Sequence, residues 1–199
     1  VLDYAPELDR RCRPHLKSTN DSWRVDETYV KVKKQWKYLY RAVDSKGNTI
    51  DFLLTARRDA EAAKRFFMSA LKATHTQLPR VINMAITDAE ASSACLAINV
   101  DKNPSYPPAI EQLKKSTVLP QKTKLRQVKY LNNMVEQDHR SVKHLINPGM
   151  SFGSFNSARR TIKGYEAMNM LRKGQINNVE QGDIIGQISF INQIFGLAA

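Results

Sequence analysis

Three acidic residues lie where a sheet and a helix could bring their carboxylates together. Asp26 lies within the first predicted strand, Asp101 directly follows the fourth, and Glu136 lies in the first turns of a later predicted helix. If the first and fourth strands are neighbours, Asp26 and Asp101 converge, and the helix can add Glu136. Three such carboxylates repel one another unless they hold divalent cations. Oxygen ligands of this kind favour Mg²⁺ or Mn²⁺.

This set of acids suits chemistry at a phosphodiester bond. Two metal ions about 3.5–4 Å apart can activate a water or a 3′-hydroxyl and stabilise the leaving oxygen. No nucleophilic side chain is then needed, and the sequence has no convincing Cys/His or Ser/His/Asp arrangement. The two cysteines, Cys12 and Cys95, form no C-x-x-C pair, and we expect reduced thiols in a cytoplasmic protein. The triad alone is a weak signal, because 19 acids offer many triples.

Three basic side chains share the predicted helix face of Glu136. At about 100° per residue, His139, Arg140 and Lys143 follow it at i+3, i+4 and i+7. A carboxylate with cations one and two turns onward suits a metal site beside a DNA backbone, so these three are candidate DNA-binding residues. The alternative is ordinary ion pairing on a solvated helix, with His139 as a surface histidine.

The charge of the chain favours a polyanionic partner. Lys and Arg number 31 against 19 acids, for a net charge of +12 and a pI of about 9.8. DNA, RNA and an anionic membrane all fit such an excess. Nucleic acid is preferred, because no apolar run approaches the roughly 20 residues of a membrane span and no basic amphipathic helix has a bulky apolar face.

The order of predicted elements indicates an α/β protein. β-branched and aromatic residues in two runs around Lys33-Lys34 predict a hairpin. Strands are predicted at 22–32, 36–44, 49–54, 96–100 and 125–131, and helices at 57–73 (with Thr55 as N-cap), 106–115, 134–146 and 157–173. This order predicts a mixed five-stranded sheet, three antiparallel strands followed by alternating α and β, with helices on both faces.

We expect three regions along the chain. Residues 1–19, which contain Pro6 and Pro14, suit a basic linker lying on phosphates or a solvated arm. Residues 20–175 form the catalytic core. Residues 176–199 form a tail with a weak helix or an oligomer contact.

The fourth strand has two candidates. Val81-Ile82-Asn83 and Ile98-Asn99-Val100 look like two halves of a split strand, with about 17 inserted residues between them. We favour Leu96–Val100 because it leads into Asp101. If Arg80–Ile86 formed the strand instead, Asp101 would be displaced and the site broken.

Other polar and aromatic residues have simpler interpretations. We expect Glu27 and Asp44 to be charges at strand edges, and Asp88, a rival second acid, to lie on the surface. For the aromatic residues of the hairpin, packing in the core or on the sheet face is expected rather than stacking on bases. These are Trp23, Trp36, Tyr38 and Tyr40.

Longer motifs carry a specific resemblance. They are SWRVDETYVKVKKQWKYLYRAVDSKGNTIDFLL, VDKNPSYPPAI, KYLNNMVEQDHRSVK and FGSFNSARRTIKGYEAM, and 34 residues separate Asp101 from Glu136. From Ala5 to Gln175 the chain resembles the DDE transposases of small bacterial insertion sequences, in the group that forms cointegrates. That family has a helix-turn-helix region before the point where this chain starts, so the resemblance does not extend specific end recognition to these residues.

The resemblance implies a fold and an activity. The fold is RNase H-like, as in retroviral integrases, and Asp26, Asp101 and Glu136 are the catalytic and metal-binding acids. Lys143 matches a basic residue that contacts transposon-end DNA. Expected partners are two Mg²⁺ or Mn²⁺ ions, double-stranded DNA and further copies of the chain, in the bacterial cytoplasm at the nucleoid and not at a membrane. Two alternatives stay open, namely an inactive DNA-binding remnant and a structure-selective nuclease.

Overall fold

Three consecutive strands form an antiparallel meander in the computed structural model. They are β1 (Trp23–Val32), β2 (Gln35–Val43) and β3 (Thr49–Thr55). Lys33 and Lys34 form the two-residue turn between β1 and β2, which confirms the predicted hairpin. β2 pairs antiparallel with β3, with Tyr40 opposite Leu53.

Two shorter strands complete a mixed sheet. β4 (Ala97–Val100) pairs parallel with β1, and β5 (Lys124–Gln127) pairs parallel with β4, giving the order β3-β2-β1-β4-β5. The favoured segment, and not 80–86, therefore forms the strand beside β1. Residues 80–86 and Asp88 lie outside the residues described, and so does the second half of the predicted fifth strand.

The structure describes residues 2–20, 22–73, 75, 97–100, 103–127, 133–147 and 151–197. The chain forms two compact units, each considered by itself. The first unit comprises Val1–Ser18, Val30–Trp36 and His139–Ala199, and the second comprises Thr19–Tyr29 and Lys37–Asp138.

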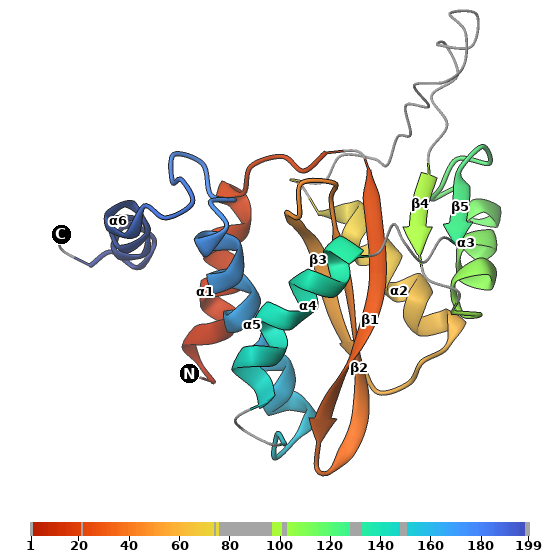
Figure 1. Cartoon of the computed structure of the whole chain (residues 1–199), viewed down its shortest axis with the longest axis horizontal. Coiled ribbons are helices and arrows are strands. Elements are labelled where there is room, and N and C mark those ends of the chain that lie inside the picture. The colour runs from red at the N-terminus through yellow and green to blue at the C-terminus, as the bar shows by residue number, and fades with distance from the viewer. Residues whose placement is uncertain are drawn as a thin grey trace, which may run out of the picture. The chain divides into compact units, whose positions relative to one another are not determined.

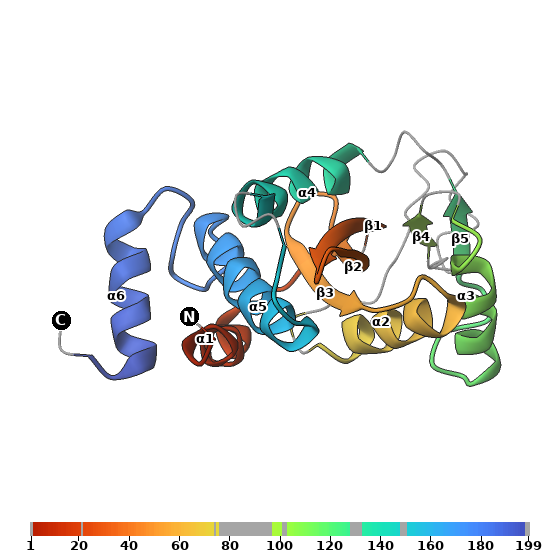
Figure 2. The same ribbon diagram turned by 90° about the horizontal axis from the view of Figure 1, so that it is seen from below.

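Two helices cover one face of the sheet in the second unit. α2 (Ala60–Lys72) and α3 (Tyr106–Lys115) bury their apolar sides against β1, β2 and β4 (Figures 1 and 2). The aromatic residues at the centre of this core are Trp23, Tyr40, Phe66, Phe67 and Tyr106. The N-cap of α2 is Asp59, which accepts from Ala62 N at 2.8 Å, and not Thr55, whose hydroxyl donates to Arg57 O.

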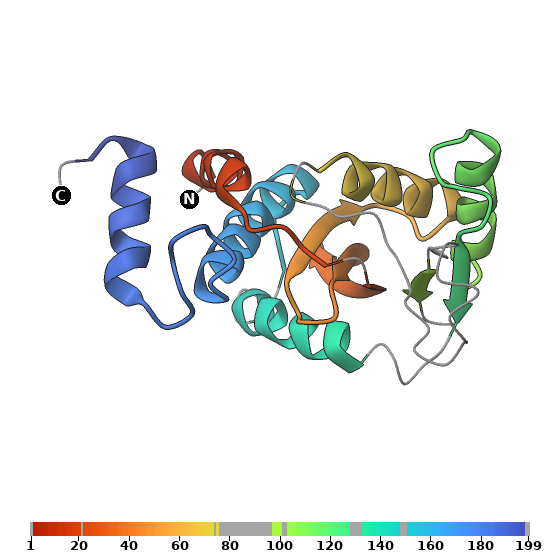
Figure 3. The ribbon, with the colours of Figure 1, turned by 90° about the horizontal axis from the view of Figure 1, so that it is seen from above.

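The opposite face of the sheet receives the start of α4 (Asn133–Ile146) (Figure 3). Arg41 on β2 and Asp138 in α4 form an ion pair of 2.5 Å, and their side chains are 0% and 6% exposed. Side chains alternate across a strand, so Arg41 points away from the face on which Tyr40 packs. Helices therefore lie on both faces of the sheet, as expected.

The first unit contains a helix that we did not expect. α1 (Tyr4–Cys12), followed by a short 3-10 turn (Arg13–His15), packs along α5 (Phe155–Arg172). A Cβ added at Gly164 would lie 2.6 Å from the Cβ of Ala5, so a glycine permits this close approach. Pro6 falls in the first turn of α1, where proline is tolerated. The N-terminal segment is thus a packed helix and not a linker or solvated arm.

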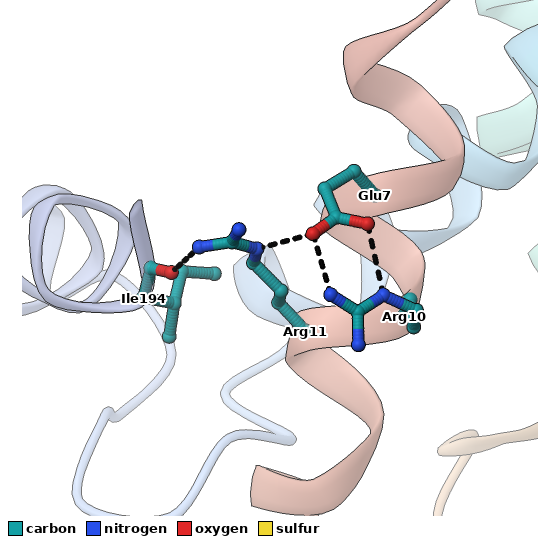
Figure 4. A network of polar contacts seen from close by, with 4 residues as sticks. All are labelled: Glu7, Arg10, Arg11 and Ile194. Carbon is teal, nitrogen blue, oxygen red and sulfur yellow. Dashed lines mark hydrogen bonds and ion pairs between the residues drawn. The ribbon is translucent and has the colours of Figure 1, made fainter. Parts of the chain in front are cut away.

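The C-terminal tail forms α6 (Ile184–Phe195), which confirms the expected helix. Its Phe190 joins a core made with α1 and α5 that includes Cys12, Met170 and Leu171. Arg11 of α1 donates to the carbonyl of Ile194, and its guanidinium also bonds Glu7, as Figure 4 shows. The oligomer contact suggested for this tail stays a prediction. Among the described helices, none has the length and apolar character needed to cross a membrane.

Candidate active site

The register of β1 and β4 bears directly on the first two acids. Trp23, Arg24 and Val25 pair in parallel with Ile98, Asn99 and Val100. The next residues of the two strands in sequence are Asp26 and Asp101. Asp26 is half-buried on β1. Asp101 lies outside the described residues, so its position beside Asp26 stays a prediction.

Glu136 is placed by the residue two positions after it. Asp138 is buried by its ion pair with Arg41, which fixes one side of the first half of α4 toward the sheet. Two residues correspond to about 200° around a helix. Glu136 is accordingly exposed in the first turn of α4. The sequence gave no role to Asp138, although its position at i+2 from a candidate ligand is the signal that could have found it.

The described acids do not complete a metal site by themselves. Within the described ranges, no group of three or more His, Cys, Asp or Glu side chains gathers closely enough to hold a metal ion. The third acid of the predicted set, Asp101, is outside those ranges.

A buried polar network lies directly beside Asp26, and our expectation for Glu27 was wrong. The carboxylate of Glu27 accepts from Asn103 Nδ2 at 2.8 Å and from the Tyr106 hydroxyl at 2.5 Å, and it pairs with Arg58. Its side chain is 1% exposed. Glu27 is therefore an interior anion and not a charge at a strand edge.

This network joins the parts of the chain that flank the two predicted aspartates. Asn103 follows Asp101 by two residues, and Tyr106 is the first residue of α3. Asn103 Oδ1 also accepts from the backbone and the hydroxyl of Ser105, both at 3.0 Å. The alternation of β1 could have revealed Glu27, because Trp23, Val25 and Glu27 share one buried face while Asp26 lies on the other.

The sequence and structure can be compared with known proteins at this point. The model of a family described as a DDE domain matches residues 20–95 and 79–175. The transposase for the insertion sequence-like element IS431mec of Staphylococcus aureus (strain Mu50) is 34% identical over 173 residues, covering 87% of this chain and 67% of the relative. The transposase for insertion sequence element IS257 in transposon Tn4003 of Staphylococcus aureus matches to the same extent.

The chain belongs to the DDE transposases of small insertion sequences. The two matched segments of this transposase both include residues 79–95, where we expected an insertion. Its fold is that of retroviral integrase catalytic cores, which is RNase H-like. The HTLV-2 integrase catalytic core domain in complex with magnesium, in its trimeric form, aligns with a TM-score of 0.52 at 15% identity, over 83% of this chain and 93% of that one. Its dimeric form gives a TM-score of 0.52 at 16% identity, with 80% and 90% covered.

The helix cations of this transposase do not all reach the surface. Arg140 is exposed and Lys143 is half-buried, but His139 is only 5% exposed. His139 lies about 60° from Glu136 around α4, toward the side that carries Asp138. The expectation of a surface histidine was wrong, and His139 is not available for DNA binding in this conformation.

Two further expectations need correction. Asp44 is fully buried and accepts from the backbone of Lys46 and Asn48 at 2.8 and 2.9 Å, so it organises the turn between β2 and β3. Trp23 and Tyr40 are buried as expected, but Trp36 is 58% exposed because it follows the turn of the β1–β2 hairpin.

Proposed function

We propose that this chain is the catalytic domain of a transposase that cleaves DNA and transfers strands through Asp26, Asp101 and Glu136. The observation that carries the proposal is the parallel pairing of β1 with β4, after which Asp26 and Asp101 are the next residues of their strands. The family membership of the chain supports it. The two family matches together span residues 20–175, which supports this range as the catalytic core.

The donor atoms of the three acids suit a hard divalent cation. All are carboxylate oxygens, which Mg²⁺ and Mn²⁺ prefer, and Asp26 and Glu136 each leave part of their side chain accessible. When bound, two such ions activate a water or a DNA 3′-hydroxyl and stabilise the leaving oxygen. Asp26, Asp101 and Glu136 would hold them.

The chain's own residues orient these ligands. β1 fixes the backbone of Asp26 between β2 and β4. The Arg41–Asp138 pair sets the rotation of α4 that exposes Glu136. Glu27 bonds Asn103 and thereby restrains the segment that begins at Asp101. The substrate we propose is double-stranded DNA, bound by an assembly of several copies of the chain in the bacterial cytoplasm, with Arg140 and Lys143 on the DNA backbone.

A catalytically inactive DNA-binding form is the second candidate. The observation that favours it is the double match of residues 79–95, because an insertion before β4 can displace Asp101. In that case the fold and the basic surface persist while the metal site is incomplete.

A strand-transfer assay separates the candidates. The full chain is incubated with Mg²⁺, a duplex oligonucleotide with a free 3′-hydroxyl and a supercoiled plasmid. Asp26→Asn, Asp101→Asn and Glu136→Gln are expected to reduce joined products to background, whereas Glu111→Gln, at an exposed acid of α3, retains activity. Nicking without joining would identify a nuclease, and full activity of Glu136→Gln would overturn the triad.

Metal binding is measured in parallel by thermal unfolding with and without Mg²⁺. A ligand that binds only the folded state raises the melting temperature. We expect this increase in the wild-type chain and not in Asp26→Asn. No increase and no strand transfer in the wild-type chain would identify the inactive form.

A further inference from the structure

The turn of the β1–β2 hairpin carries a concentration of positive charge. No acidic residue occurs between Glu27 and Asp44, whereas this stretch contains four lysines and one arginine. Three of the lysines, Lys31, Lys33 and Lys34, lie with Trp36 in the segment Lys31–Trp36, which we call the hairpin tip. All residues of the hairpin tip belong to the first unit.

The backbone of the turn is unfavourable for lysine. Lys33 and Lys34 have φ values of 48° and 62°, in the left-handed region. A two-residue turn with both residues at positive φ favours Asn-Gly, because these residues adopt it with little strain. Strained backbone that persists at a surface turn points to a role for the side chains it carries.

The hairpin tip is held in place by the segment that precedes α5. Lys33 N donates to Phe152 O at 2.8 Å, Phe152 N donates to Lys31 O at 3.0 Å, and Lys34 N donates to the Ser151 hydroxyl at 3.1 Å. These bonds use the backbone amides of the turn, so the ammonium groups are the cationic groups the turn presents to solvent. A turn anchored in this way loses little freedom when a ligand binds.

The side chains of the hairpin tip face solvent. Lys33 and Lys34 are exposed, and within the part of the chain that the structure describes neither has an ion-pair partner. The Lys31 ammonium lies 5.1 Å from the ring centroid of Trp36, which is 58% exposed. Unpaired cations beside an exposed aromatic ring suit a phosphate backbone with sugars and bases next to it.

We propose that the hairpin tip is a DNA-binding element that contacts the phosphate backbone of duplex DNA through Lys31, Lys33 and Lys34. The choice of DNA over another polyanion rests on the proposed transposase function. Phosphate contacts position a protein on DNA and carry no base sequence, so binding at the hairpin tip is independent of sequence.

The double variant Lys33→Asn/Lys34→Gly tests the proposal without removing the turn. It introduces the residues that the turn favours, so the melting temperature of the full chain is expected to stay the same or rise. The affinity for a 30-base-pair duplex, measured by fluorescence anisotropy, is expected to fall about ten-fold at 0.1 M KCl. The slope of log affinity against log salt is expected to decrease by about 2, since each phosphate contact contributes roughly 0.9.

A matched control removes the same charge elsewhere. Lys72→Gln/Lys115→Gln changes two exposed lysines at the ends of α2 and α3, and is expected to keep the wild-type affinity and slope. DNA is also expected to quench the fluorescence of exposed Trp36 and leave that of buried Trp23 unchanged, so Trp36→Phe removes the response.

Three outcomes would overturn the proposal. They are wild-type affinity and slope in the hairpin variant, an equal loss in the control, and tighter binding to phosphatidylserine vesicles than to DNA at the same salt concentration. Failure of the transposase function is distinguished by Asp26→Asn: if that variant transfers strands like the wild type while the hairpin variant loses DNA affinity, only the catalytic assignment fails.

Discussion

Two glutamates bind arginines in this protein, one in each unit, and their surroundings are opposite. Glu27 in the second unit is buried and accepts from Asn103 and Tyr106 in addition to pairing with Arg58. Glu7 in the first unit lies on α1, where it bonds the arginines three and four residues later (Figure 4). Both carboxylates are held by guanidinium groups, but only Glu27 is taken out of water.

The difference shows that burial, and not the presence of an ion pair, sets the energetic weight of a charge. Exposed pairs contribute about 0–1 kcal/mol, because water and salt screen them. Removing one partner of a buried pair costs about 3–5 kcal/mol, because the remaining polar groups lose their compensation. The bonds of Glu7 lie within one helix, whereas those of Glu27 join β1 to the segment after β4 and to α3.

The largest effect is expected for Glu27→Ala. This change leaves Arg58, Asn103 and Tyr106 without their shared acceptor, so we expect the free energy of unfolding to fall by about 3 kcal/mol. Urea denaturation measures the change. Glu61→Ala, at an exposed acid in the first turn of α2, is the control and is expected to change stability by less than about 0.5 kcal/mol. Equal effects of the two substitutions would remove the contrast between buried and exposed glutamates.

Tyr106→Phe isolates one bond of the buried network. The ring keeps its contacts with Phe67 and Tyr40, while the hydrogen bond to a charged acceptor is lost. We expect the free energy of unfolding to fall by about 1.5–2 kcal/mol. Thermal and urea unfolding should agree on this value, and a loss below about 0.5 kcal/mol would mean that the hydroxyl is not a partner of Glu27.

Asn103→Ala tests whether the buried network also positions the proposed metal ligands. Loss of its bond to Glu27 is expected to cost about 1 kcal/mol of stability. It should also raise the Mg²⁺ concentration that gives half of the thermal stabilisation by several-fold, because the segment after β4 is less restrained. Glu7→Gln is the control for the metal response and should leave it unchanged. An unchanged Mg²⁺ response in Asn103→Ala would confine the network to a structural role.

The smallest effect is expected for Glu7→Gln. Hydrogen bonds from Arg10 and then Arg11 lower the pKa of Glu7 from 4.5 to about 2. A lowered folded-state pKa stabilises the folded protein above the unfolded value, and this contribution is lost as pH falls from about 4.5 through about 2. The melting temperature should therefore differ from the wild type by at most about 2 °C at pH 7 and not at all near pH 2. A larger difference that persists at 0.5 M salt would contradict a screened surface interaction.

The sequence contained enough information for the strand order and for most helix positions. Val and aromatic residues in β1 and β2 are favourable only in strands, and α3 follows its proline pair, so local preference and burial agree there. The N-cap of α2 and the helix α1 were harder to predict. Asp59 competes with Thr55 only through geometry, and α1 depends on the small residues Ala5 and Gly164, which allow two helices distant in sequence to approach.

What the sequence determined by itself is the family, the parallel-sheet context of Asp26 and the basic hairpin turn, because each follows from residue type and spacing along the chain. The tertiary structure decided which charges are buried. Glu27, Asp138 and His139 each sit beside a candidate site residue in sequence, and nothing local distinguishes them from surface charges. Their burial depends on partners contributed by other elements, such as Arg58, Asn103 and Arg41, and those partners come together only when the sheet forms.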